Sequence, residues 1–442
     1  MKKRRLNLAS KSPYIILLMG FAILILVGSL LFMLPFATKE GQAISYIDSL
    51  FLSTSAICVT GLVSSPLPLA ELLSPFGCII LLLLVEVGGL GFITLVTFAF
   101  SLMGKKAGVS TNLLLKEAMN QNSYQELIPL GKKIVLTSFL FQGIGVIFNT
   151  VAFCIEGFNF FESLWYSIFH TISAFNNAGF DIFGPNSLIL FKDDVFFNIV
   201  TMILIVLGGI GFIVIDDIVT KKSIKKLSIH SKLVLSMTLA LLTLGTLVFK
   251  FSMSDDITWL QAMFTSVTCR TAGFTTLDLS TLSPSAYIMA ILLMLVGASP
   301  CSTGGGVKTT TFLVMLVTVL FYARGQKPRI FKRKIAEISI VKAFVLFGVA
   351  ILMALTATLI IGISQPELEV SDVLFEVISG FSTTGLSLGI TTQLNWFSKL
   401  VICLMMFLGR IGMLTIMGVL NRNWMSESKE NIQYVEERII VG

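Results

Sequence analysis

Thr268-Cys269-Arg270-Thr271-Ala272-Gly273-Phe274 is a short, partly polar stretch with a glycine, placed between apolar runs that are long enough to cross a membrane. Three other stretches follow the same design, in which a Ser- or Thr-bearing apolar run leads to a small or polar pair, a glycine and a bulky apolar residue. These stretches cover residues 53–62, 173–180 and 379–386. Four copies in one chain predict four equivalent backbone loops around one axis.

The composition predicts a polytopic membrane protein. Of the 442 residues, 55% are hydrophobic and 13% are charged, whereas a soluble domain has about 25% charged residues. The first apolar run, residues 14–34, is long enough to span a bilayer and lacks the small-x-small cleavage site of a signal peptide. We therefore expect it to be a transmembrane helix.

The cysteines and histidines do not form the pattern of a disulfide framework or a metal centre. The six cysteines lie in or beside apolar runs without a CxxC spacing, and His170 and His230 fall in different repeats. No Ser-His-Asp set and no HExxH motif appears in the sequence. The sequence therefore predicts neither an enzyme nor an organic cofactor.

The basic residues indicate which loops face the cytoplasm. Residues 2–11 and the segments 105–133, 221–232, 324–342 and 422–438 contain 25 of the 32 Lys and Arg residues. By the positive-inside rule these segments, and therefore both termini, are cytoplasmic in a multi-pass plasma-membrane protein. The intervening loops are acidic, which raises the local cation concentration at an entrance. This topology explains the net charge of +7, so nucleic acid is not an expected partner.

The apolar runs divide the chain into four tandem units. The predicted boundaries are 1–104, 105–220, 221–323 and 324–420, followed by a cytoplasmic tail at 421–442. Each unit has a long helix, a short helix, a glycine loop and a second long helix. The first long helices are expected at about 14–34, 133–154, 233–251 and 341–363, and the second at about 75–103, 195–219, 286–322 and 396–420.

The short helices decide the fold class. They are expected at about 46–57, 161–174, 257–269 and 371–381, and they are too short for a hydrocarbon core about 30 Å thick. We therefore interpret them as re-entrant. The predicted fold is an all-α polytopic membrane protein, with eight spanning helices and four re-entrant pore helices in a pseudo-four-fold arrangement around one pore.

One glycine per loop is what a ring of inward-facing carbonyls requires. Gly61, Gly179, Gly273 and Gly385 follow the short helices and are separated by 118, 94 and 112 residues. Glycine reaches backbone conformations that a side chain makes costly, and rings of backbone carbonyls replace the hydration shell of K+. The predicted K+ site consists of the three residues at each loop, Val59, Thr60, Gly61, Asn177, Ala178, Gly179, Thr271, Ala272, Gly273, Thr383, Thr384 and Gly385. None of the loops is TVGYG, so we expect looser discrimination among K+, Rb+ and Na+.

The third unit breaks its second helix. Residues 297–309 contain Pro300 and three consecutive glycines, which cannot extend a regular helix through a bilayer. We predict a gating loop at about 298–309 that lies in the permeation path. Its candidate gate residues are Ser302, Thr303, Gly304, Gly305, Gly306 and Lys308. The stretch is not a phosphate loop, because Val307 separates the last glycine from the lysine.

A charged residue at membrane depth costs free energy, so its presence indicates a structural or functional role. Arg410 lies in a glycine cluster of unit four that is equivalent to clusters at 88–91 and 208–211. We expect these glycines to allow close helix packing. For Arg410 we weigh two roles, a barrier facing the pore below the glycine ring and a structural cation bonded to helix carbonyls. Arg270 could form a buried ion pair with Glu376.

The combined motifs resemble those of the Trk/Ktr/HKT superfamily of K+ transporters, and most closely those of the bacterial Ktr-type membrane subunit. The resemblance covers nearly all of the chain. It implies that Gly61, Gly179, Gly273 and Gly385 form a selectivity filter, that 298–309 is an intramembrane gate and that Arg410 is a barrier beneath the filter. A glycine at position 61, where Na+-preferring plant relatives have serine, implies a preference for K+.

The resemblance also implies partners. Ktr-type relatives are homodimers in membrane lipid, and each subunit has its own pore. They sit on a cytoplasmic ring of RCK-type, nucleotide-binding regulatory subunits, and uptake is often stimulated by Na+. The expected function is K+ uptake across the bacterial plasma membrane; the alternative is a less selective Na+/K+ transporter of the same superfamily.

Two other classes of transport protein fit the sequence less well. A voltage-gated four-domain channel would need helices with regularly spaced arginines, which this chain lacks. A secondary carrier with inverted repeats is disfavoured because the four units run in parallel.

Overall fold

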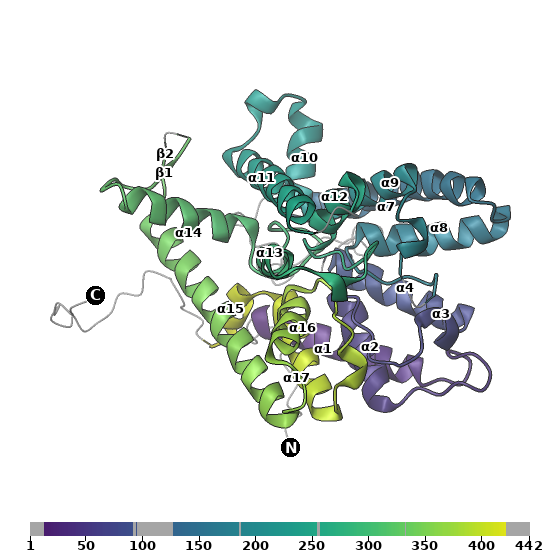
Figure 1. Cartoon of the computed structure of the whole chain (residues 1–442). Helices are drawn as coiled ribbons and strands as arrows, with labels where there is room; N and C mark the ends of the chain where they lie inside the picture. Colours follow the sequence, from purple (N-terminus) through teal and green to yellow (C-terminus); the bar gives the residue numbers. More distant parts are fainter. Residues whose placement is uncertain are drawn as a thin grey trace, which may run out of the picture.

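The computed structural model describes residues 13–91, 94, 127–184, 187–253, 257–331 and 333–420. Within these ranges the chain is almost entirely helical (Figure 1). The one sheet in the described ranges is a two-stranded antiparallel hairpin, β1 (Arg329–Ile330) and β2 (Arg333–Lys334), in which Arg329 pairs with Lys334. The predicted tail at 421–442 and most of the basic segment 105–133 lie outside the described residues.

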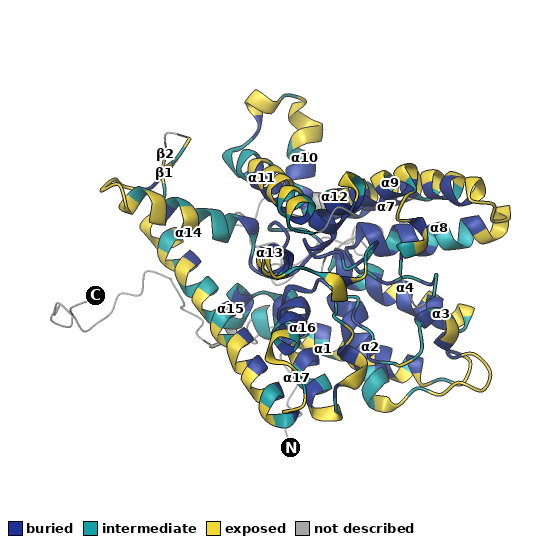
Figure 2. Cartoon of the chain, viewed as in Figure 1, coloured by how far each residue is buried: buried dark blue, intermediate teal, exposed yellow. Residues whose placement is uncertain are grey.

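Among the described residues, four single helices are long and apolar enough to cross a membrane. They are α1 (Pro13–Phe32), α7 (Leu127–Ile155), α11 (Ile229–Ser252) and α15 (Glu337–Ser364). Each is the first helix of a predicted unit. Their outward faces carry exposed large apolar side chains, among them Leu30, Leu140, Leu239 and Leu359, and the exposed residues follow the outer sides of α7, α11 and α15 (Figure 2). Such faces are suited to lipid rather than water.

Four short helices lie inside this framework. They are α2 (Tyr46–Cys58), α8 (Phe160–Phe175), α12 (Trp259–Thr268) and α16 (Val370–Ser382), and each packs against the long helix that precedes it. The sequence fixes the start of three of them, because Ser45, Asn159 and Thr258 cap the first turn with their side chains. Their C-terminal halves are buried, which places the glycine loops in the interior.

The second helices are shorter than the sequence predicts. They are α4 (Pro75–Leu90), α9 (Val195–Gly209), α13 (Pro284–Leu295) and α17 (Trp396–Ile411). Three of these continue after a break as α10 (Phe212–Lys221), α14 (Thr309–Tyr322) and α18 (Met413–Leu420). The predicted interruption in unit three is present, and α14 then lies beside α15 with the hairpin at their junction (Figure 1).

The prediction of a continuous helix at 195–219 is wrong, and so is that of a continuous helix at 396–420. α9 and α10 are bent by 99°, and α17 ends before Gly412. The cause is the last glycine of each cluster, because Gly91, Gly211 and Gly412 have φ of 81°, 93° and 86°, a region outside the helix that glycine enters freely. In unit one α4 ends at Leu90, before the equivalent Gly91, and most of the rest of the predicted helix to 103 lies outside the described residues. Within the described residues, the second helix is thus interrupted in units two, three and four.

Short elements lie between each glycine loop and the second helix of its unit. They are α3 (Leu69–Leu72), η2 (Ile189–Phe191), η4 (Leu279–Thr281) and η5 (Thr391–Gln393). A further short element, η3 (Ile224–Lys226), lies between α10 and α11. The core surrounds the short helices and includes fully buried Phe51, Phe169, Phe264 and Phe375, one from each of them. The four glycine loops are thus held by packed apolar side chains on their outer sides.

An ion pair joins the first and the last unit. Lys399 Nζ, at the start of α17, lies 2.6 Å from Asp48 Oδ1 in the first turn of α2. The hydroxyls of Ser64 and Ser45 also donate to this carboxylate, at 2.6 and 2.7 Å. Partial burial alone would raise the pKa of Asp48, but the hydrogen bonds from Lys399 and the two serines outweigh it and lower the pKa.

We expect Lys399→Met to lower the free energy of unfolding by about 1–3 kcal/mol, between the values for exposed and fully buried pairs. Chemical or thermal unfolding in detergent measures this loss, and Asp48→Asn in the same chain should recover part of it. Because the folded-state pKa of Asp48 is lowered, the stabilisation is complete at neutral pH and is lost as the pH falls through that pKa. Equal stability of Lys399→Met and the wild-type protein would contradict the assignment.

Candidate functional site

The four predicted glycines come together in the interior. All four have positive φ, between 71° and 95°. A methyl group on each would collide with a backbone carbonyl of the next unit: Gly61 with Ala178, Gly179 with Ala272, Gly273 with Thr384, and Gly385 with Thr60. The contacts run through the units in order, and the fourth returns to the first. Glycine is therefore required at each position by both conformation and space.

The residue two positions before each glycine also has an uncommon conformation. Val59, Asn177, Thr271 and Thr383 are left-handed, with φ of 56°, 58°, 70° and 54°. This conformation is rare for residues other than glycine, and for a β-branched residue it signals local strain. Its repetition at one position of four loops shows that the loops share one backbone shape.

Backbone N–H groups of the loops donate hydrogen bonds to carbonyls near the C-terminal ends of the short helices. The N–H groups of Thr60, Ala178 and Thr384 donate to the carbonyls of Ser55, Ser173 and Ser379 at 2.8–2.9 Å. In unit three the N–H of Ala272 donates to the carbonyl of Thr268, four residues before it, at 3.0 Å. Because these donors are used within each unit, the polar groups that remain for a ligand are oxygens. The helix C-termini behind the loops add a partial negative charge, which favours cations.

A cavity opens onto two of the four glycines, on the side of the connecting loops. Its volume is about 270 Å³, and its lining includes Gly61, Gly179 and Asp181. Asp181 is two residues beyond Gly179, so a carboxylate lies at this entrance. Such a charge raises the cation concentration at the mouth of a pathway.

The interrupted segment of unit three lies on the opposite side of the glycines and fills the break of unit two. The N–H groups of Ser299 and Thr303 donate to the carbonyls of Gly209 and Gly208 at 3.0 and 3.2 Å, and Phe212 N–H donates to Cys301 O at 2.8 Å. Two broken helices therefore satisfy each other's backbone groups. This is the condition under which irregular backbone is tolerated at membrane depth.

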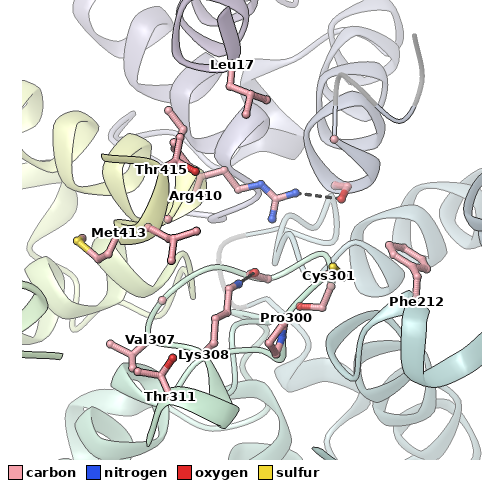
Figure 3. Close-up of a pocket in the computed structure, with 18 of the residues that line it drawn as sticks. Leu17, Phe212, Pro300, Cys301, Val307, Lys308, Thr311, Arg410, Met413 and Thr415 are labelled. Carbon is pink, nitrogen blue, oxygen red and sulfur yellow. Dashed lines mark hydrogen bonds between the residues drawn. The ribbon is translucent and has the colours of Figure 1, made fainter. Parts of the chain in front are cut away.

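A second cavity, of about 260 Å³, lies beyond this segment and contains both predicted cations (Figure 3). Arg410 extends from α17 and donates to the carbonyls of Thr303, Gly88 and Gly89, the last at 2.9 Å. Lys308 Nζ donates to Gly304 O at 2.8 Å. Arg410 is therefore bonded to backbone carbonyls, as the structural role requires, and it also lines the cavity.

The predicted ion pair between Arg270 and Glu376 is wrong. Glu376 instead accepts a hydrogen bond from Thr391 of its own unit. Arg270 is buried and lines a small space together with Val206 and Leu242 of the neighbouring helices. Arg270 thus lies beside residues of α9 and α11, whereas Glu376 bonds to Thr391 of η5.

Sequence reasoning missed a polar cluster behind the second loop. The Glu86 carboxylate accepts hydrogen bonds from Gln142 Nε2 at 3.0 and 3.1 Å and from Asn176 Nδ2 at 2.7 Å. Asn176 precedes the predicted site residue Asn177, so Glu86 fixes the loop from behind. An acidic residue inside the apolar run of α4 was the available signal, because such residues are rare at membrane depth.

The first glycine of each cluster packs against a short helix, as predicted. Methyl groups on Gly88, Gly208 and Gly409 would collide with the carbonyls of Ile57, Phe175 and Phe381, each four residues before a loop glycine. The second helices thus approach the loops closely enough to support them.

Gly409→Ala should therefore lower the free energy of unfolding by about 1–3 kcal/mol through overpacking. Gly348→Ala in α15 is the matched control, because a methyl group there meets no atom within 4 Å and alanine favours a helix by about 0.5–1 kcal/mol. Thermal unfolding in detergent compares the two variants. A tolerated Gly409→Ala would show that the helix and the loop are not in rigid contact.

Comparison with known proteins shows to which family this chain belongs. A family model for TrkH, described as a cation transport protein, matches residues 1–434. The potassium/sodium uptake protein NtpJ of Enterococcus hirae is 36% identical over 444 residues, which cover 98% of this chain and 97% of that protein. The Ktr system potassium uptake protein D of Bacillus subtilis is 34% identical, with coverage of 98% and 97%. The crystal structure of the potassium transporter TrkH from Vibrio parahaemolyticus matches with a TM-score of 0.73 at 20% identity, over 96% of this chain and 88% of that chain.

Fold and matches together define a polytopic membrane transport protein. The chain belongs to the TrkH family of cation transport proteins. The resemblance to the Trk/Ktr/HKT superfamily is confirmed, and so is the prediction that the chain is not an enzyme, because the matched proteins are ion transporters.

Proposed function

We propose that this chain takes up K+ across the bacterial plasma membrane through a selectivity filter built from its four glycine loops. The observation that carries the proposal is the closed sequence of glycine-to-carbonyl contacts, from Gly61 through Gly179 and Gly273 to Gly385 and back. Relatives that are 33–36% identical over nearly the whole chain are named as potassium or potassium/sodium uptake proteins.

The chemistry of the loops supports a monovalent cation as cargo. A dehydrated K+ needs several oxygen ligands that share its charge, and backbone carbonyls supply them in known filters. The three loop residues of each unit provide these carbonyls, in a pseudo-four-fold arrangement of the units 1–104, 105–220, 221–323 and 324–420. K+ is thus held as a substrate at backbone oxygens.

The alternative is a less selective Na+/K+ transporter. It is kept because the loops lack the TVGYG sequence and because one relative is named as a potassium/sodium uptake protein. Na+ would then be a second cargo or a stimulating ion. The glycine at position 61 favours K+ as the main cargo.

The segment at about 298–309 is proposed as the gate. It lies between the glycine loops and the 260 Å³ cavity, and Arg410 bonds to it through Thr303 O. Ser302, Thr303, Gly304, Gly305 and Gly306 would have to move for an ion to pass. Arg410 and Lys308 would then act as a barrier of positive charge below the filter.

The proposed assembly is a homodimer in lipid on a ring of RCK-type, nucleotide-binding regulatory subunits, with both termini cytoplasmic. The relatives named as parts of a Ktr system support the existence of a partner. Basic residues of the segment 324–342, including Arg329 and Arg333 of the hairpin, are candidates for docking. Nucleic acid is not a proposed partner.

Gly61→Ser tests the filter. A side chain at this position collides with Ala178 O, so the loop must shift and the K+/Na+ uptake ratio should fall at least several-fold. Gly41→Ser is the control, because Gly41 also has positive φ but faces open space. Uptake of both ions in a transport-deficient cell measures the ratio. An unchanged ratio in Gly61→Ser would contradict the filter.

Arg410→Gln tests the gate. Removing the charge and its bonds to Thr303 and Gly89 should raise the basal Rb+ flux of the purified chain in liposomes, because the segment loses its anchor. One charged hydrogen bond contributes about 1.5–3 kcal/mol, so an increase of about tenfold or more is expected. Arg324→Gln, at an exposed arginine after α14, controls for the loss of charge. Flux at the wild-type level would count against a gating role.

A further inference from the structure

Three side chains form the lower rim of the glycine loops. Asn177, Thr271 and Thr383 occupy the same left-handed position of units two, three and four, and all three are fully buried. We call these three residues the collar. The equivalent residue of unit one is Val59, whose side chain cannot bind an ion. The collar therefore has up to three side-chain oxygens just below the backbone carbonyls.

The proposed gate segment occupies the collar in this structure. Gly305 N–H donates to Thr383 Oγ1 at 2.9 Å. The Thr303 hydroxyl lies 3.3 Å from the Asn177 side-chain amide, and the same amide lies 3.3 Å from the Thr271 hydroxyl. The segment thus contacts the rim of three units at once.

Close approach to the collar also explains the glycines of the segment. A methyl group on Gly304 would collide with the Thr271 hydroxyl, and one on Gly305 would lie 2.6 Å from the Thr383 hydroxyl. Consecutive glycines therefore serve more than the interruption of a helix, because they let the backbone fit against the hydroxyls. A residue with a side chain could interrupt the helix equally well but could not make this contact.

We propose that the collar is an ion site for which the gate segment and a permeating K+ compete. Hydroxyl and amide oxygens are ligands of the same kind as the backbone carbonyls above them, and K+ accepts both. While the segment is in place, the Thr383 hydroxyl and the Asn177 amide are used by Gly305 and Thr303. When the segment leaves, the same oxygens become available to an ion. This inference rests on the proposed K+ pathway and adds a site to it.

The charges below the collar strengthen the competition. Lys308 Nζ bonds to Gly304 O, and Arg410 bonds to Thr303 O. A cation entering the collar would meet both positive charges and would also displace Gly305 from Thr383. K+ binding is therefore unfavourable with the segment in place and favourable once it has moved. A ligand with such a difference in affinity shifts the population toward the open arrangement.

The consequence can be measured at Cys301, which lies on the gate segment and lines the 260 Å³ cavity. The experiment uses the full chain with Cys154→Ser, because Cys154 is exposed and the cysteines 58, 78, 269 and 403 are buried. The rate at which a charged methanethiosulfonate reagent modifies Cys301 is recorded in liposomes, with K+ or with N-methylglucamine of equal ionic strength. We expect the rate to rise with K+ concentration and to saturate.

Thr383→Val removes the hydroxyl that both competitors use. It should raise the rate without K+ by about 2- to 13-fold, the range set by one net hydrogen bond, and it should reduce the K+ dependence. Thr383→Ser should restore both features. Thr358→Val is the matched control, because this buried hydroxyl bonds only within α15 to Ala354 O. Thr271→Val provides a second collar variant if Thr383→Val does not fold.

A Rb+ flux measurement on the same liposomes separates the two proposals. Flux in the wild-type chain, together with a Cys301 rate that does not depend on K+, would overturn the collar and leave the K+ pathway standing. A K+-dependent rate that persists unchanged in both collar variants would also overturn it. Absence of flux with the regulatory partner present would contradict the proposed function itself.

Discussion

The structure depends on one packing constraint: at each of four loops, the backbone of one unit lies against a carbonyl of the next at a glycine. The contact admits no side chain, so Gly61, Gly179, Gly273 and Gly385 are fixed by sterics as well as by positive φ. The surrounding helices maintain this contact. The short helices accept the loop amides, the clusters at Gly88, Gly208 and Gly409 bring the second helices against them, and the pair of Asp48 and Lys399 joins the last unit to the first.

The same constraint accounts for the segment of unit three. Space beneath the glycine loops is narrow, and only a backbone without side chains at Gly304 and Gly305 fits against Thr271 and Thr383. Arg410 then joins this segment to the end of α4 through carbonyls of both. Backbone packing and buried charge therefore act on one short stretch of chain. A small movement of this segment therefore alters its contacts with units two, three and four.

Much of this was predictable because repetition multiplies a weak signal. A single glycine loop predicts only a turn, whereas four glycine loops that each follow a short apolar helix indicate one common arrangement. The break at Gly211 could not be predicted, because one glycine within an apolar run is equally compatible with close helix packing. Arg270 and Glu86 show the same limit: sequence indicates that such charges need partners, but the direction of a side chain decides which. Glu86 bonds to Gln142 and Asn176, whereas Arg270 does not pair with Glu376.

We propose that the four glycine loops bind a monovalent cation by their backbone oxygens. Crystals grown in Rb+ test it most directly, because anomalous scattering locates the ion without reference to the protein. We expect a Rb+ peak between the carbonyl oxygens of the residues that precede the four glycines, Thr60, Ala178, Ala272 and Thr384. Rb+ bound elsewhere, for example beside Glu86, with no peak between the loops would contradict it.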